Sequence, residues 1–382
     1  MSRTGLAAQI GYALESTVGT PVTTTAFIPL VSESLTQDRT RLESSGILAG
    51  RRVLTSDQYN GGDVTVSGSV QHELYNRGLG KLFTAMFGTV ATTGAGPYTH
   101  TFTPGDLTGD ALTVQVGRPA TNGTVFPFTY AGMKVASWEI ACAAGEIATL
   151  GMDLVGAREF AFRTVTDGVT TSGSASISSV TAAFSVDDIG KPISGTGIPS
   201  GATIIAVASG TAATLSANAS ATGTGVTFTF GVALATATYP GSIKPLKFNH
   251  ASVTLGGSAV NVKSLTLSGS NMLDDSRRFL GSQYISEPLE IGLREYTGSL
   301  EIEFTDLTQY TRFVAGTEAA LVASFVSGSD SVTITSNVRV DGTTPNVAGR
   351  EILTQTLPIK CIASSTDASA ITAVLVNSDS TP

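Results

Sequence analysis

Two segments of the chain change from the alternation of a strand to the spacing of a helix. Residues 62–88 and 298–325 each begin with apolar side chains at every second position, which is typical of a half-buried strand. Each then places apolar side chains three and four residues apart, as on one helix face, and we expect the first helix at residues 72–87. Gly88 suits the C-cap of that helix, and Asp306 suits the N-cap of the second. Such a short helix in a mostly β chain indicates that it covers a sheet.

Residues 132–157 contain the clearest hairpin, with a turn between two alternating runs. One set of alternate residues is apolar: Ala136, Trp138, Ile140, Ala148, Leu150, Met152 and Leu154. The other set is small, polar and acidic and includes Glu139 and Asp153. Glu301 and Glu303 alternate with apolar neighbours in the same way. The pattern predicts a sheet with one face packed on a core and the other face facing solvent.

The composition changes sharply in residues 164–231, which Gly, Ser, Thr and Ala dominate. The charged residues of this segment are Asp167, Asp187, Asp188 and Lys191. Short apolar runs alternate with turn signals, which predicts a small separate β module of about six short strands. Residues 1–163 and 232–382 would then form one discontinuous domain. Its two strand-to-helix segments hint at two similar halves without establishing a duplication.

Residues 39–61 are unusually rich in arginine for a chain with few charges. The four arginines are Arg39, Arg41, Arg51 and Arg52. The segment has no strong hydrophobic period, so it is either a solvated loop or an ordered contact between subunits. Residues 1–38 are expected to form an N-terminal arm that leads into a first strand.

The composition favours an all-β protein that buries surface against neighbours. The chain has 42 glycines among 382 residues, only 14% charged residues, and a positive mean hydropathy. Its net charge of −8 argues against a protein that grips nucleic-acid phosphates. Cys142 and Cys361 lie in strand-like apolar contexts, so we expect free buried thiols and folding in a reducing cytoplasm. We expect neither a signal peptide nor a transmembrane helix.

The residues that usually carry chemistry are scattered. His72, His100 and His250 have no ligand partners at metal-site spacing, and no nucleophile elbow or phosphate loop occurs. Acidic pairs such as Glu301 and Glu303 would suit a glycosidase, but their alternation on a strand favours a solvated face. We expect a non-enzymatic protein without a cofactor or metal, and keep a glycan-degrading enzyme as an alternative.

The order of several segments resembles the tail tube, or major tail, proteins of long-tailed bacteriophages with non-contractile tails. The segments include GLAAQIGYALESTVGTPVTTTAFIPL, YAGMKVASWEIACAAGEIATLGMDLVG, PLKFNHASVTLGGSAVNVKSLTLSGSN, YTGSLEIEFTD and VAGREILTQTLPIKCIA. Residues 164–231 look like a β module found inserted in various phage tail proteins. The resemblance implies a β-sandwich with a flanking helix, six subunits per ring, and rings stacked into a hollow tube whose sheets close into a barrel.

The resemblance also implies roles for the residues above. Glu139, Asp153, Glu301 and Glu303 would line the lumen, where negative charge lets double-stranded DNA pass without sticking. Residues 39–61 would reach an adjacent ring, and residues 164–231 would decorate the outside. Expected partners are further copies of the chain, the tape measure protein, and the terminator and distal tail or baseplate proteins. The protein would belong to the virion and assemble in the bacterial cytoplasm. A tail fibre or carbohydrate-binding adhesin is the main alternative.

Overall fold

A computed structural model describes residues 4–342, 344–347, 349–364 and 369–382. The protein is mainly β, as the sequence predicted, and most strands belong to one large curled sheet. The strands before the module are β1 (Gln9–Leu14), β2 (Ala26–Phe27), β3 (Ser32–Glu33), β4 (Thr36–Glu43), β5 (Tyr59–Glu73), β6 (Gly88–Thr93), β7 (Tyr98–Pro104), β8 (Leu112–Pro119), β9 (Val125–Ala143), β10 (Thr149–Gly156) and β11 (Arg158–Ala161). Those after it are β18 (Ala251–Leu255), β19 (Ser258–Ala259), β20 (Val262–Ser270), β21 (Leu273–Asp274), β22 (Leu289–Glu290), β23 (Glu295–Glu303), β24 (Glu318–Ser327), β25 (Asp330–Val340), β26 (Thr354–Cys361) and β27 (Ile371–Asn377).

Two layers of antiparallel strands enclose the main core. The first layer, here called the inner sheet, runs β4-β5-β10-β9-β20-β23-β26. The second layer consists of β1, β8 and β11 in the first half and of β18, β24, β25 and β27 in the second. The long strand β9 belongs to both layers, because its beginning pairs with β8 and β11 and its end with β10 and β20. Apolar side chains of both layers form one continuous core between them.

The two helices are equal in length but differ in burial. Helix α1 (Gly80–Phe87) is buried almost throughout and packs against strands of both layers, whereas α2 (Thr308–Ala315) buries none of its residues. Gly88 and Gly316 end the helices at positive φ, as expected of C-caps. The expected start of the first helix at residue 72 was wrong, because β5 continues to Glu73 in register with β10 and the helix begins only at Gly80.

The N-terminal region is part of the fold. Strand β1 pairs along its whole length with β8, and Ile10 and Tyr12 are fully buried. The expectation of an arm at residues 1–38 was therefore wrong for the residues that the structure describes. The segment has too few alternating positions to predict a strand by itself, and its burial comes from long-range pairing.

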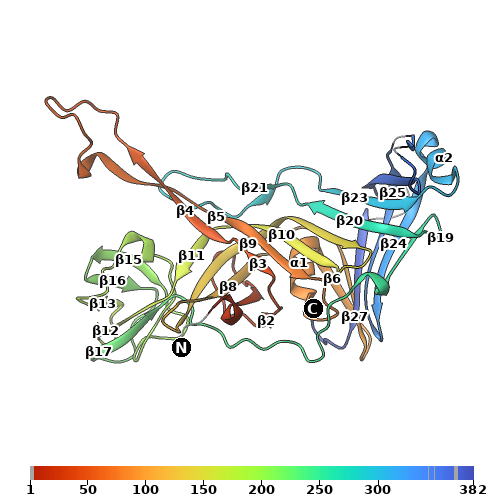
Figure 1. Cartoon of the computed structure of the whole chain (residues 1–382). Coiled ribbons are helices and arrows are strands. Elements are labelled where there is room, and N and C mark those ends of the chain that lie inside the picture. The colour runs from red at the N-terminus through yellow and green to blue at the C-terminus, as the bar shows by residue number, and fades with distance from the viewer. Residues whose placement is uncertain (1–3, 343, 348, 365–368) are drawn as a thin grey trace.

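The glycine-rich module forms a sheet with a core of its own. Its strands are β12 (Arg163–Thr170), β13 (Ser176–Ser178), β14 (Ile193–Ser194), β15 (Ile204–Ser209), β16 (Ala212–Leu215) and β17 (Gly223–Phe230). Hydrogen bonds from the amides of Ile193 and Ile204 to the carbonyls of Ala202 and Lys191 bring the two edges of this sheet together. A separate cluster around Phe228 and Phe230 fills it. The module lies at the end of the molecule opposite α2 (Figure 1).

Residues 39–61 are largely a hairpin. Strand β4 ends at Glu43, a short 3-10 turn covers Ser56–Gln58, and β5 begins at Tyr59. Figure 1 shows this hairpin projecting beyond the two layers at the upper left, and we call residues 40–61 the arm. Neither face of the arm is buried, which explains why its sequence shows no alternation of apolar and polar residues.

Candidate functional site

The four acidic residues expected to share a surface lie on one face of the inner sheet. Glu139 of β9 is the direct neighbour of Gly151 on β10 and of Ser268 on β20. Asp153 lies two residues along from Gly151, and Glu301 and Glu303 lie on β23 within the same alternation. Direct neighbours across an antiparallel ladder point to the same side, so the pairing register gathers these carboxylates on one face, here called the acidic face.

Small hydroxyl side chains surround these carboxylates. The hydroxyls of Ser69 and Ser137 each donate a 2.6 Å hydrogen bond to the Asp153 carboxylate, and Ser264 donates to Glu301 at 3.2 Å. Lys263 Nζ lies 3.3 Å from Glu303, which offsets part of the negative charge there. The alternate residues of the same strands, such as Trp138, face the core. The acidic face is consequently hydrophilic and carries a net negative charge.

Sequence reasoning missed further charged residues on this face. Glu73 on β5 and Glu295 on β23 belong to the same alternation, as does Lys360 on β26. Lys360 Nζ lies 3.2 Å from the Glu295 carboxylate, so these two charges form a pair. The signal was available, because Glu295 lies at an even spacing from Glu301 on one strand. The sequence pattern did not show that β23 begins as early as Glu295, so this residue was not assigned to the strand.

The arm carries large apolar side chains that are exposed among the residues that the structure describes. Ile47 is 96% exposed and Val53 is 77% exposed, and other apolar side chains of the arm are also exposed: Leu42, Leu48, Leu54 and Tyr59. A two-stranded hairpin is marginally stable by itself in water, and clustered exposed apolar side chains mark a surface for binding. The arm is therefore a candidate contact surface.

The four arginines of residues 39–61 lie in two different environments. Arg41, Arg51 and Arg52 lie on the arm and are exposed. Arg39 instead donates two 2.8 Å hydrogen bonds to the Asp187 carboxylate of the module, and this bidentate ion pair lowers the pKa of Asp187. Arg39 thus joins the base of the arm to the module.

A second arginine strengthens this junction. The Arg158 guanidinium lies 4.0 Å from the ring centroid of Tyr284, a cation–π contact, and donates to the backbone oxygen of Asp187 at 3.3 Å. Tyr284 belongs to the long connection between β20 and β23. Four segments far apart in the sequence therefore meet here, and the module is fastened to the base of the arm rather than only tethered by its ends.

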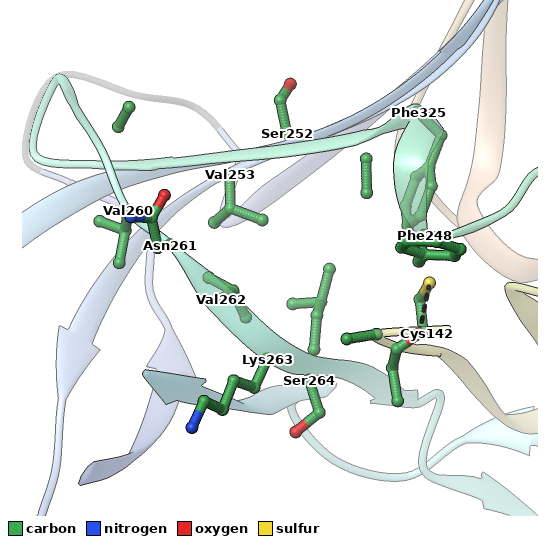
Figure 2. A pocket seen from close by; sticks show the side chains of 15 residues that line it. Cys142, Phe248, Ser252, Val253, Val260, Asn261, Val262, Lys263, Ser264 and Phe325 are labelled. Carbon is green, nitrogen blue, oxygen red and sulfur yellow. Dashed lines mark hydrogen bonds between the residues drawn. The ribbon is translucent and has the colours of Figure 1, made fainter. Parts of the chain in front are cut away.

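A partly apolar pocket lies between β18 and β20, where the two layers part. Figure 2 shows Cys142, Phe248 and Phe325 at one end of it and Val260 and Val262 at the other. Burial, together with the nearby charge of Glu146, raises the pKa of the Cys142 thiol. A raised pKa disfavours the thiolate, so this cysteine is a poor nucleophile. The connection between β1 and β3 is longer than that between β18 and β20, and it buries Phe27 and Ile28.

The described residues offer neither a metal site nor a membrane-spanning helix. No three His, Cys, Asp or Glu side chains come together as metal ligands in that part of the chain. None of the helices described is both long and apolar enough to span a membrane. Cys142 and Cys361 are free thiols, as expected, but only Cys361 is buried and Cys142 is partly exposed.

The fold is that of a mainly β protein with an extended two-layer sheet and a projecting, exposed arm. The model of the phage tail tube protein family matches residues 5–204 and 194–361, which together cover most of the chain. The chain therefore belongs to the phage tail tube protein family. A search of curated proteins found no significant match.

Proposed function

We propose that this chain is the subunit of a phage tail tube, and that it assembles into closed rings with six-fold geometry that stack around a channel for double-stranded DNA. The observation that carries the proposal is the acidic face, a continuous hydrophilic surface across the strands of one curled sheet. A sheet that closes around a ring loses its free edges, and its inward face becomes the channel wall.

In this arrangement Glu139, Asp153, Glu301 and Glu303 repel DNA phosphates, so that the genome slides through the channel without binding. Other partners would be the tape measure protein inside the tube during assembly and the terminator and distal tail or baseplate proteins at its ends. No cofactor and no membrane take part. The protein would be assembled in the host cytoplasm and reside in the virion.

A charge series on the acidic face tests the channel role. In one variant all four carboxylates become amides (Glu139→Gln, Asp153→Asn, Glu301→Gln, Glu303→Gln), and in the other all four become lysine. Tubes should form in both, while DNA retention in the tube should increase from wild type to amide to lysine and weaken with salt. Equal DNA passage through all three kinds of tube would refute the channel role.

The arm would make the contact between stacked rings through Arg41, Arg51, Arg52 and its apolar tip. The double variant Ile47→Asp/Val53→Asp should still form rings but should stack them into tubes at least about tenfold less, because it places charge on a surface that must be dehydrated. Val180→Asp, at an equally exposed valine of the module, is the matched control. Normal tube formation by the arm variant would show that the arm does not make the stacking contact.

The alternative, a carbohydrate-binding adhesin, rests on the module alone. It predicts discrete particles and glycan binding without tubes. Glycan binding by a chain that forms no rings under the electron microscope would favour it over the tube.

A further inference from the structure

The strand pairings that precede the module recur in the same order after it. Before the module the pairs are β1·β8, β4·β5, β5·β10, β8·β9, β9·β10 and β9·β11. After it they are β18·β24, β20·β23, β23·β26, β24·β25, β25·β26 and β25·β27. All are antiparallel, and α1 and α2 follow equivalent strands. The hairpin β6·β7 and the module have no counterpart among the strands described after residue 231.

Equivalent residues carry equivalent geometry. The segments SGSVQHEL at 67–74 and TGSLEIEF at 297–304 occupy the same place in the two sets of strands. A Cβ on Gly68 would lie 2.4 Å from the Ser34 oxygen, and a Cβ on Gly298 would lie 2.4 Å from the Thr266 oxygen. At both positions the absence of a Cβ therefore lets the backbone of the preceding segment approach equally closely. The chain contains two tandem copies of one fold unit, which we call the first and second repeat.

The two repeats join through their inner strands. Residues 137–143 of β9, in the first repeat, pair with residues 264–270 of β20, in the second. This junction makes the inner sheet continuous from one repeat to the next. It is a head-to-tail contact, because the last inner strand of one repeat meets the first inner strand of the following one.

The two outer ends of the chain's inner sheet resemble the two sides of this junction: one end has the strands equivalent to β20, and the other has those equivalent to β9 and β10. Strands β3 and β4 occupy in the first repeat the place of β20, and among the described residues they pair only with β5. At the other end, β25 pairs with β26 only over Val338–Val340, whereas the corresponding strand β9 runs on beside β10. The Asp341 amide still donates to the Pro358 oxygen, so the free edge described on β26 is residues 354–357. The equivalent residues of β10 in the first repeat are paired with β9.

Side chains of the same chain form hydrogen bonds with backbone groups at the β3–β4 edge. Ser34 donates its amide to the Ser69 oxygen on β5, so the backbone of Leu35 points away from β5. The Glu33 carboxylate accepts the Leu35 amide at 2.9 Å, and Arg118 and Tyr130 donate to the Leu35 oxygen at 2.6 and 2.9 Å. Such caps keep an edge from pairing in a free subunit.

We propose that successive chains join as the two repeats join, with the β3–β4 edge of one chain beside the β25–β26 end of a second copy. The inference rests on the proposed ring: each chain then supplies two of its six positions, and three chains close it. This number is half of the six subunits that the sequence resemblance implied. The module, present once for every two repeats, would project three times per ring.

Native mass spectrometry and electron microscopy of assembled rings test this stoichiometry. The expected ring mass is about 117 kDa, three chains of 39.0 kDa, and end-on averages should show three outer projections. Rings of about 234 kDa with six projections would overturn the inference and leave the tube function standing. A chain that forms no rings under any condition would overturn the tube function itself.

A single substitution tests the edge. Gln37 follows Leu35 by two residues in the same register, so its amide also points away from β5. Gln37→Pro removes that donor, and proline is tolerated on an edge strand. We expect a folded monomer with ring formation reduced at least tenfold, whereas Gln37→Ala, which keeps the amide and loses the same side-chain bond to Glu159, should assemble. Wild-type assembly by a folded Gln37→Pro chain would refute the edge contact.

Discussion

The buried His72 should make the free energy of unfolding of this protein depend on pH. Its ring lies between the Tyr12 hydroxyl, 2.6 Å from Nε2, and the Pro29 oxygen, 2.8 Å from Nδ1. In the neutral ring that satisfies both bonds, Nδ1 donates to Pro29 and Nε2 accepts from Tyr12. Burial lowers the pKa of His72 to about 4, against the partial opposing effect of the Pro29 bond.

The pKa shift fixes the sign and size of the effect. The unfolded chain takes up this proton near pH 6.5 and the folded chain only near pH 4. The contribution of the neutral ring is therefore complete above pH 6.5 and decreases as the pH falls toward 4. Linkage gives a loss of about 2.5 kcal/mol in the free energy of unfolding between about pH 7.5 and 4.5.

The double variant His72→Ile/Tyr12→Phe removes both polar partners together. Ile302 occupies the position of His72 in the second repeat, so isoleucine suits this place in the fold. Urea unfolding followed by the fluorescence of Trp138, the single tryptophan, reports on this core. The wild type should lose about 2.5 kcal/mol more than the variant over this pH range. Parallel losses in both proteins would refute the titration of His72 as the cause.

Two further predictions concern the module. In a double-mutant cycle of Arg39→Ala and Asp187→Ala, followed by thermal unfolding, the coupling should be about 1 kcal/mol, because the pair is bidentate but partly exposed; a coupling near zero would show that Arg39 does not hold the module. Replacing residues 164–231 by a short glycine linker should leave tubes of unchanged inner width under the electron microscope, since the module has its own core; loss of tubes would make the module part of the wall.

Alternation predicted the acidic face well, because a period of two is a local property of each strand. Glu139 and Glu301 could be assigned to polar faces without knowing that their strands share one sheet. The junction of β9 with β20 that brings them together is a long-range pairing, which no local pattern contains.

Long-range pairing also explains the errors. His72 and Tyr75 have helical spacing with Leu79, yet pairing with β10 keeps this stretch extended to Glu73. The partner of Arg39 could not be predicted because Asp187 lies 148 residues away, in a 3-10 turn of the module. The internal repetition was obscured in the sequence because the β6–β7 hairpin and the module alter the spacing of equivalent segments.

Electron microscopy of the purified chain over a range of concentrations tests the central claim most directly. A tail tube subunit should give rings at low concentration and hollow tubes of constant width at high concentration, with no other protein added. Discrete particles at every concentration, from a chain shown to be folded by its Trp138 fluorescence, would contradict the assignment of a self-assembling tube.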